Sequence, residues 1–441
     1  MENTFSRRKW TVLLLFGLIG QIAWSVENMY FNLFVFETIE ENLDAITLMV
    51  QLSGIAATVV TLAMGTLSDK IGNRRSLISF GYMIWGFTVA IFGFISPDLI
   101  TKLFGMEYAE AVKIALATVI IGDCVMTFFG STANDAAFSA WVTDNTEESY
   151  RGRVESIIAI LPLAAMLIVA GGFGILAEAM GYKYLFLALG IVISISGVIG
   201  IFIIRDSETL SASGTLRDIA YGFKPSTVRN NKELYLTLII AAIYGVACQI
   251  FMPYLIIYMK TYLSFSVIEY SIVFGLAIGL GALINVFLGK LSDKKSKIDS
   301  IYIAASIFFV GLFGMFLSRS ESHTVNLLVF GIFGFVMITG FIYVSALTGA
   351  LIRDYTPERD AGKLQGTRMI FSVLIPMLSG PAIGNAINKS ANIPLPDAGA
   401  DAMTTLYIPS PKIFLAASLI SLLIFAIVPI LKKAATKSKA N

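Results

Sequence analysis

The sequence contains few of the residues on which most enzymes and secreted domains depend. Its 441 residues include 1 histidine and 2 cysteines, and charged residues make up 14% of the chain. Cys124 and Cys248 fall inside apolar runs, so we expect buried small residues and no disulfide framework. His323 lies beside a loop, and a single histidine provides little material for a metal cluster or for acid–base catalysis. We therefore expect no enzyme, no metal and no cofactor.

Hydrophobic residues make up 56% of the chain, and the charged share is well below that of soluble globular proteins. The hydrophobic residues form twelve runs that are long enough to cross a bilayer as helices. The first run follows Arg7-Arg8-Lys9 and is too long for the core of a cleavable signal peptide. We expect transmembrane helices at about 10–36, 44–67, 75–96, 113–142, 152–178, 183–204, 233–260, 266–289, 300–318, 324–351, 364–388 and 411–431.

The charge of the loops predicts the orientation. Twelve crossings place both ends of the chain on one side, and most Lys and Arg residues fall in the loops of that side. The opposite loops are acidic or neutral, as at residues 37–41. By the positive-inside rule we expect both termini in the cytoplasm, with the protein in the inner membrane of a bacterium and in contact with its lipid.

Two sequence segments are repeated along the chain. Residues 65–75 read Gly-Thr-Leu-Ser-Asp-Lys-Ile-Gly-Asn-Arg-Arg, and residues 289–295 read Gly-Lys-Leu-Ser-Asp-Lys-Lys. Similar acidic segments begin at Asp144 and Asp354, after the fourth and tenth runs. Such repetition predicts two six-helix halves, which we expect at 1–204 and 233–441, joined by a cytoplasmic linker at 205–232.

Two segments outside the expected spans remain to be assigned. Within the linker, four apolar residues share one face at helical spacing, which predicts an amphipathic helix on the membrane surface. They are Leu216, Ile219, Ala220 and Phe223. The segment 389–410, which contains several prolines, is either an ordered outer loop or a lid.

The repeated loop motif resembles that of the major facilitator superfamily, G-x-L-x-D-[RK]-x-G-x-[RK]-[RK]. The resemblance implies an all-α integral membrane protein, with twelve transmembrane helices in two pseudo-symmetric bundles that work by alternating access. It also implies a cytoplasmic gate, in which Asp69 meets a helix N-terminus or a nearby arginine. We expect Asp69→Asn to lower transport and to leave binding intact. The expected gating residues are Gly65, Asp69, Arg74, Arg75, Asp293 and Arg151.

Three carboxylates, Glu27, Asp123 and Asp135, fall inside apolar runs. Ionisable groups within a bilayer are costly, so they indicate an ion or proton pathway. An isolated buried carboxylate holds a proton readily, which suits a proton carrier. The alternatives are a sodium site completed by other oxygen atoms and structural ion pairs with arginine. We expect the three residues to couple transport to a cation.

The sequence around Asp135 carries a narrower resemblance. Asp-Ala-Ala-Phe-Ser-Ala from Asp135, then Asp-x-Thr-x-Glu from Asp144 and Arg-Gly-Arg from Arg151, is similar to the fourth helix and following loop of the glycoside–pentoside–hexuronide symporters. Members of that family move sugars with protons or sodium, and the resemblance gives Asp135 a role in the cation and sugar sites. Their sodium-ligating aspartates lie in the second helix, which here has no carboxylate within its membrane part, so H⁺ is favoured over Na⁺.

The expected function is secondary active transport of a small polar solute, and a sugar or glycoside carried inward with a proton is the first hypothesis. The alternative is an exporter of drugs or metabolites by antiport, because the gating motif also occurs in antiporters. A nucleic-acid partner is not expected. Polar and aromatic side chains could line the substrate site, or could pack and hydrogen-bond between helices. They are Trp24, Asn28, Asn32, Asn134, Tyr254, Tyr258, Asn285, Tyr343 and Arg368.

Overall fold

The computed structural model describes residues 6–147, 150–207, 221–294, 296–318, 320–357, 361–394 and 406–440. These residues form helices and short connections, and an isolated bridge pairs Pro394 with Tyr407. Every long apolar run of the sequence is helical, because in lipid a helix satisfies its own backbone hydrogen bonds. The all-α prediction is confirmed.

The number of membrane crossings agrees with the sequence once one long helix is divided. Eleven helices among the described residues are long and apolar enough to cross a membrane. One of them, Arg151–Ile203, has 53 residues, far more than the roughly 20 that one crossing needs. It is interrupted at Gly181, whose φ of 78° and ψ of 156° are not helical and are readily adopted only without a Cβ. The break yields the fifth and sixth predicted spans.

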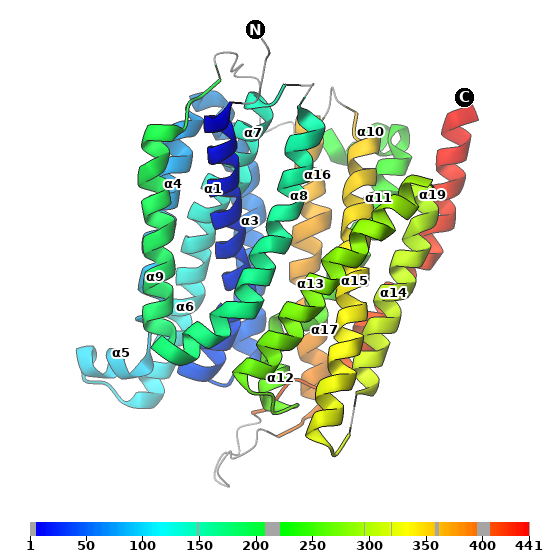
Figure 1. Ribbon diagram of the computed structural model, residues 1–441. Helices are drawn as coiled ribbons and strands as arrows, with labels where there is room; N and C mark the ends of the chain where they lie inside the picture. The colour runs from blue at the N-terminus through cyan, green and yellow to red at the C-terminus, as the bar shows by residue number, and fades with distance from the viewer. Residues whose placement is uncertain are drawn as a thin grey trace. The chain divides into compact units, whose positions relative to one another are not determined.

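The first compact unit comprises Met1–Glu41 and Leu52–Leu216. Helix α5 was not expected, because its eight residues are too short to appear as an apolar run; Ser96 caps its start and the left-handed Gly105 ends it (Figure 1). The elements are α1 (Arg7–Val26), η1 (Glu27–Phe31), α2 (Asn32–Phe34), η2 (Val35–Ile39), α4 (Arg74–Phe92), α5 (Pro97–Phe104), α6 (Tyr108–Gly130), η3 (Ser131–Phe138), α7 (Ser139–Asn145), α8 (Arg151–Ile168), η4 (Val169–Phe173) and α9 (Gly174–Ile203).

Helices α4 and α9 pack closely through small residues. A methyl group on Gly86 would overlap the carbonyl oxygen of Gly190, and one on Gly197 would overlap that of Ser79. Small residues allow backbones to approach, which is how membrane helices gain packing energy without a hydrophobic driving force between them. This contact holds the second half of α9 against α4 (Figure 1).

The second compact unit comprises Asn42–Gln51 and Arg217–Asn441. Its helices α14 and α15 use the same device, since a methyl group on Gly311 or Gly340 would overlap the backbone of the opposite helix. The elements are α10 (Pro225–Asn230), α11 (Lys232–Phe251), η6 (Met252–Tyr254), α12 (Leu255–Thr261), α13 (Val267–Lys294), α14 (Lys297–Leu317), α15 (His323–Tyr355), α16 (Ala361–Met369), η8 (Ile370–Leu374), α17 (Ile375–Ala391), α18 (Lys412–Ser421) and α19 (Leu423–Ala440).

Helix α3 (Leu43–Ile71) is divided between the two units, because residues 42–51 belong to the second and the rest to the first. Within the second unit, Thr47 Oγ1 lies 2.7 Å from Tyr254 Oη, and Gln51 Nε2 donates to the carbonyl of Leu378 at 2.7 Å. The sequence repeat gives no signal for this division of one helix.

The expected linker helix cannot be followed through the structure. Leu216, Ile219 and Ala220 lie outside the described residues, as do positions 395–405 of the outer segment. Phe223 is exposed, and the short helix α10 follows it.

Candidate transport and gating sites

Two of the three membrane carboxylates lie where a regular helix widens into π-helical turns. Glu27 begins η1 directly after α1, and Asp135 lies within η3, which continues α6. Asp123 lies in α6 itself. Single π-helical turns inside α-helices occur frequently at functional sites, so the interruptions mark this part of the first unit as a candidate site.

Glu27 joins three helices through hydroxyl groups. Its Oε1 atom accepts from Ser53 Oγ of α3 at 2.9 Å and from Thr127 Oγ1 of α6 at 3.2 Å. The two hydroxyl oxygens lie 2.8 Å from one another. All three side chains are buried. The sequence gives no reason to select Ser53 or Thr127, because a serine or threonine within an apolar run is common.

Asp123 is the acidic neighbour of Glu27. It is 2% exposed, Glu27 is 8% exposed, and the two carboxyl groups interact electrostatically. Neither forms an ion pair with any residue that the structure describes. Glu27 Oε2 and Asp123 Oδ1 are buried and accept no hydrogen bond from the described part of the chain. Two buried negative charges without a cation are costly, so the pair is most stable with at least one bound proton.

Asp135 and Asn134 have different surroundings. Asp135 is half-buried and accepts from Ser131 Oγ at 3.0 Å. Asn134 is buried, and its Nδ2 donates to Tyr82 Oη at 2.6 Å; Tyr82 in turn donates to the carbonyl of Phe16 at 2.7 Å. The amide of Asn134 therefore links α1, α4 and η3, as expected for a residue that holds helices together.

The remaining candidates of the first unit lie on α1 and its continuation. Trp24 packs on Trp85, with ring centroids 5.0 Å apart. Asn28 is exposed and donates to the carbonyl of Trp24 at 2.8 Å. Asn32 is buried, and its Nδ2 donates to the carbonyl of Asn28 at 3.0 Å. Both asparagines thus donate within their own helix, and Asn32 Oδ1 is buried with no hydrogen-bond partner among the described residues.

In the second unit, two tyrosine candidates are buried among neighbours. Tyr254 donates to the carbonyl of Pro381 at 2.9 Å. Tyr258 stacks on Tyr262, with centroids 5.0 Å apart and planes 14° from parallel. Both side chains are 0% exposed, so packing accounts for their positions.

Three further candidates lie on α13, α15 and α16. Asn285 of α13 donates to the carbonyl of Thr339 of α15 at 3.1 Å. Tyr343 of α15 lies 2.5 Å from Ser292 Oγ of α13. Arg368 of α16 is exposed. Asn285 and Tyr343 therefore link α13 to α15 within the second unit.

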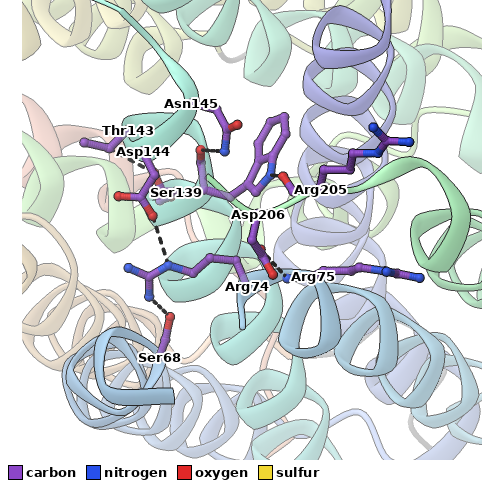
Figure 2. Close-up of polar contacts among 10 residues, drawn as sticks. Ser68, Arg74, Arg75, Ser139, Thr143, Asp144, Asn145, Arg205 and Asp206 are labelled. Atoms are coloured by element: carbon purple, nitrogen blue, oxygen red, sulfur yellow. Dashed lines mark hydrogen bonds and ion pairs between the residues drawn. The ribbon is translucent and has the colours of Figure 1, made fainter. Parts of the chain in front are cut away.

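The repeated loop motif forms a polar cluster at the start of α4 (Figure 2). Arg74 is 3% exposed; its Nε lies 3.1 Å from Asp144 Oδ2, and its guanidinium also donates to Ser68. Gly72, at φ 64°, makes the turn between α3 and α4, where only glycine is free of strain. The Asp69 side chain lies outside the described residues, so its expected pairing stays a prediction.

Arg75 has another role in the same cluster (Figure 2). Its side chain is exposed, and its backbone N–H donates to Asp206 Oδ1 at 2.9 Å. Burial raises the pKa of the Asp206 carboxyl, and the hydrogen bond from Arg75 opposes that change. Trp141 Nε1 donates to the neighbouring carbonyl of Arg205 at 2.8 Å. The chain after α9 is thereby held against α4 and α7.

The ion pair beside the second copy of the motif is more exposed to solvent than the one at Arg74. Lys297 Nζ at the start of α14 lies 2.6 Å from Asp354 Oδ2 at the end of α15, with both side chains nearly half exposed. The Asp293 side chain lies outside the described residues, and Gly65 has open space where a Cβ would stand. Arg151 is exposed at the start of α8.

The described residues contain no group of three or more His, Cys, Asp or Glu side chains that could hold a metal ion.

Two sequence comparisons give related proteins. The family model described as "Major Facilitator Superfamily" matches residues 13–381. The chain is 25% identical over 256 residues to "Multi-drug resistance efflux pump PmrA homolog" of Lactococcus lactis subsp. lactis (strain IL1403), a match that covers 56% of this chain and 60% of that relative.

Solved structures share the fold at low identity. A mutant of the nucleoside transporter NupG superposes with a TM-score of 0.69 at 10% identity, covering 96% of this chain and 99% of that one. A bacterial homologue of the iron transporter ferroportin gives 0.64 at 16%, covering 96% and 99%. A bacterial homolog of the lysosomal transporter Spinster gives 0.64 at 13%, covering 98% of each. Because the family model spans most of the sequence and these structures share its fold, the chain belongs to the Major Facilitator Superfamily and is a membrane-spanning secondary transporter, not an enzyme.

Proposed function

We propose that the chain is a proton-coupled antiporter that exports small amphipathic organic compounds. The observation that carries the coupling is the buried pair of Glu27 and Asp123, which has no cationic partner among the described residues. Two neighbouring buried carboxyl groups of this kind favour the binding and release of protons over a permanent ion pair. Export is supported by the relative whose name describes an efflux pump.

The chemistry of the candidate binding residues supports an amphipathic substrate over a sugar. Recognition of a sugar requires many free hydrogen-bonding groups. The side-chain N–H and O–H groups of Asn134, Asn285, Tyr254 and Tyr343 already donate to neighbouring helices. Aromatic contacts such as the Trp24–Trp85 pair suit apolar and cationic compounds better.

We also propose that the protein lies in a bacterial inner membrane with both termini in the cytoplasm. The arginine and lysine residues of the motif loops support this orientation. Accessibility of single cysteines introduced at loop positions to an impermeant thiol reagent tests it, and labelling of the 65–75 loop from outside intact cells would overturn it.

The function is tested with purified protein in liposomes that carry an imposed pH gradient. Addition of amphipathic cations such as ethidium should cause proton movement in the opposite direction, detected by a pH-sensitive dye. Glu27→Gln should abolish this exchange while ethidium still binds to the protein. Ethidium movement that does not depend on the pH gradient would refute proton coupling.

A second candidate function is proton-coupled uptake of a sugar or glycoside. The sequence around Asp135, which is similar to that of the glycoside–pentoside–hexuronide symporters, favours it. Labelled sugars offered to the same liposomes with an inward proton gradient test it. Uptake that is lost in Asp135→Asn would place this function first, and no uptake of any sugar would remove it.

A further inference from the structure

The short helix α5 has an exposed apolar face beside the face that packs on the protein. Helix α5 packs on α6, and Pro97 and Ile100 are its buried side chains. At 3.6 residues per turn, Leu99 and Leu103 lie about 40° apart around the helix, and they are 39% and 67% exposed. Phe104, at the end of the helix, is 69% exposed. Large apolar side chains are thus concentrated on a helix of only eight residues.

The charged side chains of α5 lie on a third face. Asp98 and Lys102 are exposed and lie about 40° apart around the helix. This charged face is about 100° from the face that carries Leu99 and Leu103. One side of the helix therefore meets protein, a second side is apolar and a third is charged. An amphipathic helix of this kind is typical of the boundary between a bilayer and water.

The length of α4 places α5 at that boundary. Helix α4 has 19 residues and is therefore about 28 Å long, close to the roughly 30 Å of the hydrocarbon core of a bilayer. It begins with Arg74 at one membrane surface and ends with Phe92, and only residues 93–96 separate it from α5. Figure 1 shows α5 at the end of the first unit opposite to the start of α1, extending sideways from the spanning helices.

A stripe of exposed apolar side chains on α4 leads to α5. On a helix that crosses a membrane, such a stripe at helical spacing contacts lipid. Beyond the end of α4, Phe94 is 37% exposed, and Lys183 Nζ lies 4.8 Å from the centroid of its ring. Exposed aromatic rings and lysine side chains are typical of the headgroup region. The side chains of the stripe are Phe80, Ile84, Phe87 and Ile91.

We propose that α5 is an interfacial helix that binds the phospholipid of the leaflet opposite to the chain termini. Leu99, Leu103 and Phe104 lie among the acyl chains, and Asp98 and Lys102 face water. The partner is lipid and not protein, because the apolar face of α5 continues the lipid-facing stripe of α4. The charged face has one charge of each sign, so attraction to anionic headgroups contributes little. Because α5 directly follows α4, its insertion fixes the depth of α4 in the bilayer.

Fluorescent labels on single cysteines test the proposal in phosphatidylcholine vesicles. Cys124 and Cys248 are first replaced by alanine, and Leu103→Cys or Lys102→Cys then carries the label. The two positions are neighbours on one helix and are both exposed, so each is a control for the other. The label at position 103 should be quenched by lipids with a quenching group on the acyl chain and not by iodide in the water. The label at position 102 should show the reverse.

A second measurement keeps the label in one place and changes the helix. With the label at Phe104→Cys, the pair Leu99→Glu and Leu103→Glu should abolish most of the quenching by the lipid probe, because charge among acyl chains is costly. The matched pair on the charged face, Asp98→Asn and Lys102→Gln, should leave that quenching unchanged. Elution from a size-exclusion column establishes that each variant is folded.

The possible results separate lipid from the other partners of the apolar face. Equal quenching of the two labels by iodide overturns the proposal, because α5 would then lie in water. Protection of the label at position 103 from both probes also overturns it, because a second protein would then cover the face. Quenching by the lipid probe that requires anionic lipid overturns the apolar basis of binding. All these results are independent of the transported compound, so failure of the exporter proposal would leave the lipid-binding helix intact.

Discussion

Arg74 of α4 and Asp144 of α7 form a partly buried ion pair in which Nε and Oδ2 lie 3.1 Å apart, with side chains 4% and 26% exposed. The corresponding pair of the second repeat, Lys297 and Asp354, is shorter at 2.6 Å but is 43% and 47% exposed. Burial, and not distance, decides how much such an ion pair contributes to stability, because water screens the charges of the exposed pair. The two ion pairs therefore differ in strength.

The first prediction compares Asp144→Asn with Asp354→Asn. The former removes the carboxylate that lies 3.1 Å from the buried Arg74 guanidinium and should destabilise the protein by about 2 kcal/mol. The latter should change stability by less than about 0.5 kcal/mol. Melting in detergent, followed by size-exclusion chromatography after heating, measures both. Equal losses in the two variants would show that the repeats are equivalent and that burial of Arg74 is unimportant.

The second prediction concerns Asn134, which sequence analysis offered as a substrate ligand. Its amide donates to Tyr82 Oη at 2.6 Å inside a buried network, so Asn134→Ala should lower stability by about 1–2 kcal/mol. Tyr82→Phe should have a similar effect, and the double variant should cost little more than either single change. Apparent affinity for the transported compound should stay within twofold. A large loss of affinity with unchanged melting would restore the binding role.

The third prediction uses the alkaline titration of Tyr407. Its hydroxyl donates to Asn385 Oδ1 at 2.8 Å and lies 3.3 Å from Asp44 Oδ1. Burial and the Asp44 charge raise the pKa of Tyr407 to about 12. The folded state thus holds the phenol proton more tightly than the unfolded chain, in which tyrosine titrates near pH 10. The stability contributed by the proton is complete below about pH 10 and is lost as pH rises through about 12.

Tyr407→Phe should therefore melt at a lower temperature than the wild type at pH 8 and should lose less stability between pH 10 and 12. Tyr262 stacks on Tyr258, and Tyr262→Phe is a control that keeps the ring. Parallel melting curves of the wild type and Tyr407→Phe across this pH range would contradict the assignment.

Much of the fold follows from features that sequence alone makes visible. Long apolar runs must be helices in lipid, and the break at Gly181 was anticipated by the gap between two runs. The segment 42–51 could not be assigned to the second unit, because that depends on contacts of Thr47 and Gln51 with helices far away in the chain.

The candidate site could be predicted only in part, because some of its residues are recognised by their chemical type and others only by their contacts. Glu27 and Asp123 stand out because charge is rare in the membrane, and both prove to be buried. Ser53 carries no such signal, and its importance comes from being 2.9 Å from Glu27. Asparagines and tyrosines suggested a substrate cavity from composition. Hydrogen-bond partners on neighbouring helices, which sequence does not reveal, give several of them a packing role.

The last prediction distinguishes the two kinds of neighbour that act on Glu27. Asp123 opposes ionisation of Glu27 through its charge, whereas Ser53 and Thr127 favour it by donating hydrogen bonds. Asp123→Asn should therefore move the pH profile of proton-coupled exchange to lower pH, and Ser53→Ala should move it to higher pH. Asp135→Asn, which removes a weaker electrostatic neighbour, should cause a smaller shift in the same direction as Asp123→Asn. The measurement is the initial rate of exchange in liposomes at fixed pH difference and varied absolute pH. Shifts of the same sign in Asp123→Asn and Ser53→Ala would mean that both changes act through general damage to the bundle, and the opposition between charge and hydroxyl donors would have to be abandoned.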